Sequence, residues 1–319
     1  LIYILLLLCS QAHAQVSLGF GSATADTNTE ITVDLLMDNS EVVKAIQLDF
    51  YFDPNLIAYV GNPTVVGTRI QEGFTAAVNE IGEGRYRALI YSPTNGEIPV
   101  GSGSVMKLSF ETGLQFGTFP IFLDNSQNGN TYTNVVVSGA SSAAISDLTL
   151  TEGSITVLSG DFNWNTTDQN FGSVVKDQAQ SFDFVLSNNG NADLVIDFIS
   201  EDLGVFQADF TAFPLTLSAG SSSNLAVSFP ANTPGSFEGT FVLQSDDPKR
   251  TDPTTFKVSA FVFSDNVAGL PSVEVASGSK AEARISFEAE EPIISFQFDI
   301  PFDSEVFTID PESVELLIT

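Results

Sequence analysis

A ten-residue stretch that is apolar at every second position constrains the fold of this chain more than any other feature. It covers residues 46–55 (IQLDFYFDPN) and stops at an Asp-Pro pair. Alternation with a period of two is typical of a strand that buries one face. The pattern therefore predicts a β-strand that buries Ile46, Leu48, Phe50 and Phe52 and turns Gln47, Asp49 and Tyr51 outward.

The same pattern returns 250 positions later, at residues 296–303 (FQFDIPFD). Gln297 and Asp299 stand there in the places of Gln47 and Asp49. Both places face outward in the predicted strand, where core packing does not require a particular residue. An internal repeat of this length indicates an array of modules. We therefore predict a second, incomplete copy of one module, and we expect the two repeated outward residues to serve binding.

Short alternating runs separated by Gly, Asn, Asp and Pro fill the first half of the chain, and no helical period interrupts them. Ten strands are predicted there, at residues 16–20, 30–37, 43–52, 56–60, 74–78, 85–91, 104–111, 119–123, 134–137 and 154–158. Such spacing indicates an all-β sandwich.

The order of these runs carries a family resemblance. A strand of the type EITVDLLM is followed by AIQLDFYFDPNL at residues 45–56, by VMKLSF at 105–110 and by GSITV at 153–157. This order resembles a cohesin domain, the nine-stranded jelly-roll module by which cellulosome scaffolds hold dockerin-bearing enzymes. The resemblance implies a jelly roll and a dockerin-like protein partner. Certain carbohydrate-binding modules share the fold, so a surface polysaccharide is the alternative partner.

The sequence pattern changes after residue 160. The runs SFDFVLSNNGNADLVI at residues 181–196 and GSFEGTFVLQSDDP at 235–248 resemble the immunoglobulin-like domains of the ASPM, SPD-2 and hydin type, which serve as spacers in bacterial surface proteins. Asn and Gly at residues 188–191 predict a tight hairpin, because both tolerate positive φ. The Asp-Asp-Pro at the end of the second run favours a turn over a metal site.

The first residues predict secretion. Residues 1–8 are almost wholly apolar, and the Ala-His-Ala that ends at Ala14 is the small-x-small pattern of a signal-peptidase site. The apolar run is much shorter than the ~20 residues that cross a bilayer, so no membrane insertion is expected once the signal is removed. The expected location is extracellular or at the surface of a bacterial cell.

The predicted organisation thus has four parts. They are a signal peptide without its basic start (1–15), a cohesin-like sandwich (16–158), an immunoglobulin-like spacer (160–265) and the start of a second cohesin-like domain (266–319).

Charge and composition exclude several function classes. The chain has 40 acidic and 11 basic residues and a net charge of −29, so nucleic acid is not an expected partner. Its single Cys and single His, Cys9 and His13, both fall in the predicted signal peptide. The mature chain therefore has neither a Ser-His-Asp or Cys-His site nor an ordinary zinc site. Carboxylate pairs remain for glycoside hydrolysis, but no motif selects two of them, and we predict no enzyme.

Asp161, Asn163 and Asn165 form Asp-x-Asn-x-Asn, the opening of a calcium loop. Such a loop also needs a glycine at its sixth position and an acid at its twelfth, where this chain has Thr and Gly. The triplet is a weak candidate for calcium, and an interdomain linker is the alternative. We expect no cofactor beyond that candidate.

The outward side of the 46–55 strand is the predicted partner surface. The resemblance to dockerin-binding cohesins implies that polar residues at the positions of Ala45 and Gln47 contact the partner. Gln47 keeps a polar side chain, whereas Ala45 does not. The neighbouring run at 85–91 adds aromatic and Arg anchors, residue types that dominate binding energies. The candidate partner-binding residues are Gln47, Asp49, Tyr51, Arg85 and Arg87, with ordinary solvated positions as the alternative.

Three functions remain open from the sequence. The first is a non-catalytic scaffold or adhesion protein whose cohesin-like modules dock other proteins. Polysaccharide degradation is one process that such docking would serve. The second is direct carbohydrate binding, against which stands the position of the only Trp, Trp164, in the expected linker. The third is a purely structural surface stalk.

Overall fold

The computed structural model describes residues 15–70, 72–123, 126–127, 130–131, 134–264, 267–269, 276–280 and 286–288, and within these ranges it contains strands and no helix. No described segment is a helix long and apolar enough to cross a membrane. The predicted signal peptide, apart from Gln15, and nearly all of the predicted second copy lie outside the described residues, including Gln297 and Asp299.

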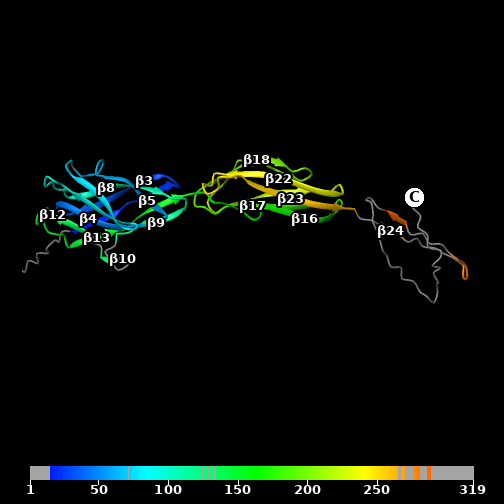
Figure 1. The fold of residues 1–319 in the computed structure, drawn as a ribbon, viewed down its shortest axis with the longest axis horizontal. Helices are drawn as coiled ribbons and strands as arrows, with labels where there is room; N and C mark the ends of the chain where they lie inside the picture. The colour runs from blue at the N-terminus through cyan, green and yellow to red at the C-terminus, as the bar shows by residue number, and fades with distance from the viewer. Residues whose placement is uncertain are drawn as a thin grey trace, which may run out of the picture.

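The first domain is a β-sandwich, drawn in blue to green in Figure 1. Its two main sheets have the orders β13-β1-β3-β8-β5 and β12-β4-β7-β6, and a third sheet has the order β2-β14-β9. The strands are β1 (Gln15–Phe20), β2 (Ser22–Asp26), β3 (Glu30–Asn39), β4 (Val43–Tyr51), β5 (Ile57–Thr64), β6 (Thr75–Gly82), β7 (Arg85–Tyr91), β8 (Gly101–Thr112), β9 (Gly117–Ile121), β12 (Val135–Ser138), β13 (Asp147–Thr151) and β14 (Gly153–Leu158). Two-residue strands β10 (Ser126–Gln127) and β11 (Asn130–Thr131) pair with each other.

The core of this domain lies between the two main sheets. The inward side chains of β4 are buried as the alternation predicts, and Phe50 and Phe52 are at most 1% exposed. The Phe52 ring stacks on Tyr86 at 5.2 Å between centroids and meets Phe110 edge-on at 5.4 Å. Each such pair adds about 1 kcal/mol beyond the burial of its area. The strand from which the fold was predicted therefore supplies the centre of the core.

The second domain is another sandwich, with sheets β15-β17-β21-β19 and β16-β23-β22-β18-β20. Its core is rich in Phe, and Phe184, Phe241 and Phe256 contact one another at ring distances of 4.9 to 5.5 Å. The strands are β15 (Phe162–Trp164), β16 (Asp168–Val175), β17 (Gln180–Asn188), β18 (Leu194–Asp202), β19 (Gln207–Ala208), β20 (Leu215–Leu217), β21 (Ser222–Phe229), β22 (Gly235–Ser245) and β23 (Thr254–Phe263). The short strands β24 (Val267–Gly269) and β25 (Ser286–Glu288) pair beyond it.

Two predictions for the second domain were wrong. Residues 188–191 do not close a hairpin, because β17 and β18 belong to different sheets, and no residue of this turn has a positive φ. Trp164 does not lie in a linker. It lies in β15, 5.0 Å from the Phe162 ring, and it packs against the core of the second domain.

Candidate functional site

The candidate site is the side of the β12-β4-β7-β6 sheet that points away from the core, called here the outer face. Strand register places its side chains in rows across the sheet. One row joins Val135, Gln47, Leu89 and Ala77, and the next joins Val137, Ala45, Tyr91 and Thr75. The centre of the outer face is therefore apolar, although Gln47 lies within it.

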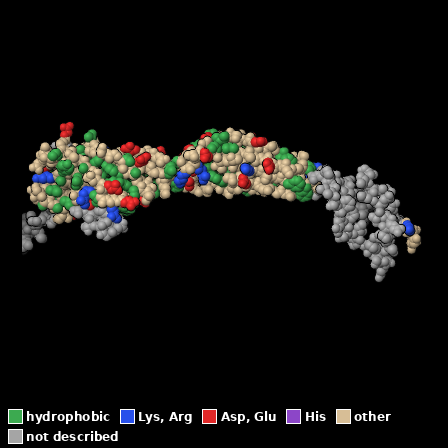
Figure 2. All heavy atoms as spheres, viewed as in Figure 1, with side chains coloured by type: hydrophobic (Ala, Val, Ile, Leu, Met, Phe, Trp, Pro, Cys, Tyr) green, Lys and Arg blue, Asp and Glu red, His purple; other side chains and the backbone are tan. Residues whose placement is uncertain are grey.

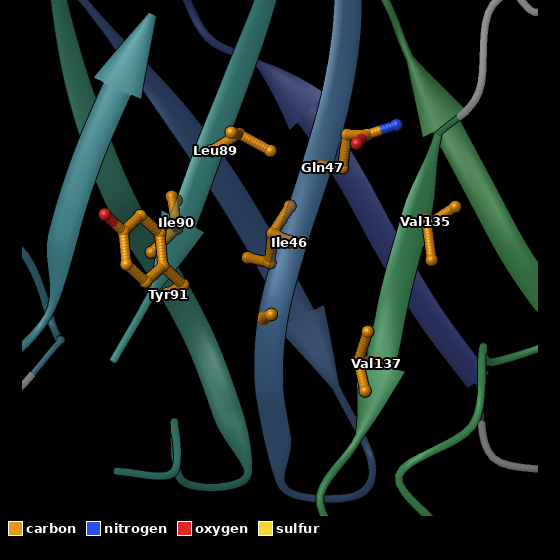
Figure 3. A pocket seen from close by; sticks show the side chains of 8 residues that line it. Ile46, Gln47, Leu89, Ile90, Tyr91, Val135 and Val137 are labelled. Carbon is orange, nitrogen blue, oxygen red and sulfur yellow. The ribbon is translucent and has the colours of Figure 1, made fainter. Parts of the chain in front are cut away.

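A hollow of about 340 Å³ lies on this face over β12, β4 and β7. Figure 3 shows Val135 and Val137 on β12 and Leu89 and Tyr91 on β7, on either side of β4. Tyr91 is 44% exposed, and the other outward side chains of the hollow are half-buried. The residues that line the hollow are Ala45, Ile46, Gln47, Leu89, Ile90, Tyr91, Val135 and Val137.

Asp49 and Arg87 form a bidentate ion pair beside the hollow. Arg87 donates from Nε to Oδ1 at 2.7 Å and from Nη2 to Oδ2 at 2.8 Å. The Asp49 side chain is fully buried, whereas that of Arg87 is 36% exposed. The hydrogen bond to Asp49 raises the pKa of Arg87 against the opposing effect of burial. Arg87 therefore keeps its charge and is held in one orientation at the surface.

The burial of Asp49 corrects the expectation that it is an outward group open to a partner. It belongs to the outward set by alternation, but its carboxylate is occupied by Arg87, and its backbone N–H donates to Asn134 Oδ1 at 2.7 Å. A partner at this face would meet Arg87, with Asp49 acting through it.

The other predicted residues lie on the same sheet. Tyr51 is half-buried, pairs with Arg85 across β4 and β7, and stacks on Phe122 at 5.9 Å between ring centroids. Gln47 lies at the hollow, one row from Asp49. The structure thus brings all five predicted residues onto one face. That they bind a partner stays a prediction.

Sequence reasoning missed the apolar part of the site. Val135, Val137 and Leu89 were assigned to strands without a role at the surface. The available signal was the unbroken apolar runs at residues 88–91 (ALIY) and 135–137 (VVV), which place apolar side chains on both faces of these strands. A contiguous group of outward apolar residues on neighbouring strands marks a candidate interaction surface.

The opposite side of the sandwich is polar. On the outer surface of the β3–β8 pair, Asp34 accepts from Lys107 Nζ at 2.7 Å, and Thr32 lies opposite Ser109. Leu36, 42% exposed, is an isolated apolar residue on that side. Only one of the two large faces therefore has an apolar centre.

The calcium candidate does not form a cation cage. Asn163 lies in the extended strand β15, between Asp161 and Asn165. Asp161 contacts Lys249 Nζ at 3.4 Å, and Asn165 Oδ1 accepts the N–H of Val185 at 2.9 Å. The oxygens are thus used by the protein itself, and no cluster of three acidic, His or Cys side chains suited to a metal occurs among the described residues. The predicted turn at Asp246-Asp247 is confirmed, since Arg250 N donates to the carbonyl of Asp247 at 2.9 Å and Lys249 N donates to Asp247 Oδ1 at 2.9 Å.

Comparisons with known proteins give one family match and a set of similar solved structures. Residues 160–261 match the family described as HYDIN/CFA65/VesB-like, Ig-like domain. No curated protein matches the chain. Solved structures similar to 45–46% of the chain include cohesins. The seventh ScaB type I cohesin from Pseudobacteroides cellulosolvens is 15% identical, over 45% of this chain and 92% of its own, with a TM-score of 0.36.

Two further structures extend this comparison. A type I cohesin–dockerin complex from Clostridium thermocellum is 14% identical, over 45% of this chain and 99% of its own, with a TM-score of 0.38. A non-cellulosomal cohesin from the archaeon Archaeoglobus fulgidus is 16% identical, over 46% and 93%, with a TM-score of 0.34.

Proposed function

We propose that the first domain is a protein-docking module whose outer face binds a dockerin-like protein module, and that the second domain is its spacer. The chain would then be a non-catalytic scaffold or adhesion protein, secreted or held at the surface of a bacterial cell. The observation that carries the proposal is the apolar hollow on the outer face, bordered by the fixed guanidinium of Arg87. The dockerin type of partner rests on the resemblance in residues 45–56.

The lining of the hollow favours a protein over a sugar. Flat sugar rings are usually met by a row of exposed aromatic side chains, whereas Val135, Val137 and Leu89 offer aliphatic surface. Aliphatic side chains of a partner would fill such a hollow and exclude water from it. Among the described residues, Tyr91 and Phe261 are the exposed aromatic side chains, and they lie in different domains.

A pair of matched substitutions tests the docking face. The immobilised full chain is challenged with the secreted proteins of the source organism, and captured proteins are identified by mass spectrometry. We expect capture of a protein with calcium-loop segments, released by a chelator. Leu89→Asp should reduce its capture at least about tenfold, because the carboxylate would be desolvated without a partner. Leu36→Asp makes the same change on the polar side and should leave capture unaltered.

Several outcomes would contradict the proposal. Capture of no calcium-loop protein would remove the dockerin-like partner, and equal losses from both substitutions would remove the outer face as the site. Circular dichroism of both variants separates a binding loss from a folding loss. Retardation of the wild-type chain in gels that contain glycans would favour carbohydrate binding. Detection of the protein in culture medium or on intact cells tests the proposed location.

A further inference from the structure

Three residues, 159–161, connect the last strand of the first domain to the first strand of the second. Two of them, Ser159 and Asp161, are hydrogen-bonded to the second domain. Ser159 N donates to Asn191 Oδ1 at 2.9 Å, and the carbonyl of Ser159 accepts the N–H groups of Asn191 and Ala192 at 3.0 and 3.2 Å. Asp161 N donates to Asn188 Oδ1 at 3.1 Å. The connection is therefore part of a hydrogen-bonded structure rather than a free tether.

Asn191 joins the two domains directly. Its Nδ2 donates to the carbonyl of Val157 at 2.9 Å, within β14 of the first domain, while its Oδ1 accepts from Ser159. One side chain of the turn 188–191 thus fixes the end of β14 against the second domain. This is the physical role of a turn that the sequence suggested to be a hairpin.

Two glycines bring the backbones together. A Cβ at Gly190 would lie 2.1 Å from the carbonyl oxygen of Ser159, and one at Gly160 would lie 2.7 Å from Leu194 Cδ1. Neither glycine has a positive φ. Gly190 is therefore needed because the turn passes so close to the backbone of the connection, and Gly160 because it packs against the Leu194 side chain; neither is needed for an unusual backbone conformation.

A second contact crosses the junction from the loop after β22. Lys249 Nζ lies 4.6 Å from the centre of the Phe116 ring of the first domain and 3.4 Å from Asp161 Oδ1. Arg250, the next residue, lies 4.2 Å from the Trp164 ring and donates from Nε to the carbonyl of Phe162 at 3.0 Å. The Asp247 carboxylate accepts the N–H of Phe162 at 3.0 Å. Two loops of the second domain, the turn 188–191 and the loop after β22, therefore contact the connection and the start of β15.

We propose that the two domains form one rigid unit, held by this junction lock of Asn191, Gly190, Gly160 and Lys249. The lock fixes the direction of the outer face relative to the long axis of the spacer, and Figure 1 shows the two sandwiches lying end to end. A flexible connection of the same length would let the first domain turn freely. This proposal does not depend on which partner the outer face binds.

Spin labels on the two domains test the lock. The exposed residues Thr32 and Thr255 are replaced by Cys in a full chain that carries Cys9→Ser, which removes the only native cysteine. Electron–electron resonance then gives the distribution of distances between the labels. We expect a single narrow distribution that roughly doubles in width in Asn191→Ala, and widens more when Gly-Ser-Gly-Ser is inserted after Gly160.

Asn224→Ala is the matched control. Asn224 also donates from Nδ2 to another residue, Asp183, but this bond joins two strands of one sheet of the second domain, and its removal should leave the distribution narrow. A broad distribution in the wild-type chain would overturn the proposal. So would a wild-type distribution that stays unchanged in both Asn191→Ala and the insertion variant. Circular dichroism shows whether both sandwiches remain folded, and the insertion removes no side chain.

Discussion

Tyr59 buries a hydroxyl group for which the described residues supply no hydrogen-bond partner. Its ring packs between Tyr86 and Phe110, at 5.3 and 5.8 Å. An unsatisfied buried polar group costs about 1–3 kcal/mol. We expect Tyr59→Phe to fold normally and to be more stable at neutral pH by about 1 kcal/mol, because the ring contacts remain and the unpaired group is gone. Urea unfolding followed by fluorescence measures the difference.

The same residue makes the first domain sensitive to alkali. Burial, with a smaller effect of Tyr86, raises the pKa of Tyr59 to about 12. The phenol ionises at about pH 10 in the unfolded chain but only at about pH 12 in the folded protein. The contribution of the neutral phenol to the free energy of unfolding is therefore fully present below pH 10 and is lost as the pH rises through 12. The stability advantage of Tyr59→Phe should therefore grow over that interval. The exposed Tyr91 supplies the control, and an equal growth in Tyr91→Phe would contradict this account.

At the level of single residues, alternation predicted the direction of a side chain but not its surroundings. Asp49 was placed on the outward side of β4, which is correct, yet its carboxylate is fully buried. Its ion pair with Arg87 joins residues 38 positions apart in the sequence. Such a contact depends on the pairing of β4 with β7, which no local pattern contains. The face was therefore predictable, and the group that a partner would meet was not.

The turn between β17 and β18 determines how the two sandwiches meet. We expect Gly190→Ala to destabilise the second domain by about 1–3 kcal/mol, since the new methyl group would overlap the Ser159 carbonyl and both backbones would have to move. Thermal unfolding by calorimetry gives the change.

Gly21→Ala is the matched control for this substitution. A Cβ at Gly21 would lie 3.5 Å from the nearest atom, the carbonyl oxygen of Asp34, which is an ordinary contact. The expected change is within about 0.5 kcal/mol. If both substitutions cost the same, the close approach at Gly190 does not matter for stability.

Strands with strong apolar alternation were predictable, and those that depend on distant partners were not. The prediction for residues 85–91 matches β7 at both ends, because apolar residues fill it and turns flank it. β2 was missed. Its sequence SATAD offers only Ala to the core, and it pairs in parallel with β14, from which more than a hundred residues separate it. β13 was missed as well, and its pairing with β1 is parallel and equally distant.

The whole molecule carries a large excess of negative charge. Acidic side chains outnumber basic ones by 40 to 11, and Figure 2 shows acidic groups on the surfaces of both domains. Four ion pairs join side chains of the described residues, at Asp34, Asp49, Asp161 and Asp247. The pairs at Asp34 and Asp161 join partly exposed side chains and contribute at most about 1 kcal/mol each. Repulsion among the remaining acids should therefore outweigh what these pairs contribute.

This balance predicts that salt stabilises the protein. Between about 0.01 M and 1 M NaCl the screening length falls from about 30 Å to about 3 Å, which removes repulsion between distant carboxylates. We expect the melting temperature to rise steadily over this range. A fall would mean that the ion pairs dominate, and that the surface charge is not a source of instability.

Calcium at matched ionic strength separates general screening from a specific site. The oxygens of Asp161 and Asn165 are held by Lys249 and by β17, so the segment offers no cage for the ion. We compare how far CaCl2 and NaCl of equal ionic strength raise the melting temperature. We expect the difference between the two salts to be the same in the wild-type chain and in Asp161→Asn. A rise at submillimolar CaCl2 that disappears in Asp161→Asn would show that calcium binds there. It would also require residues 162–164 to leave the extended conformation of β15, because alternate side chains of a strand lie on one face but about 7 Å apart along it, too far to converge on one ion.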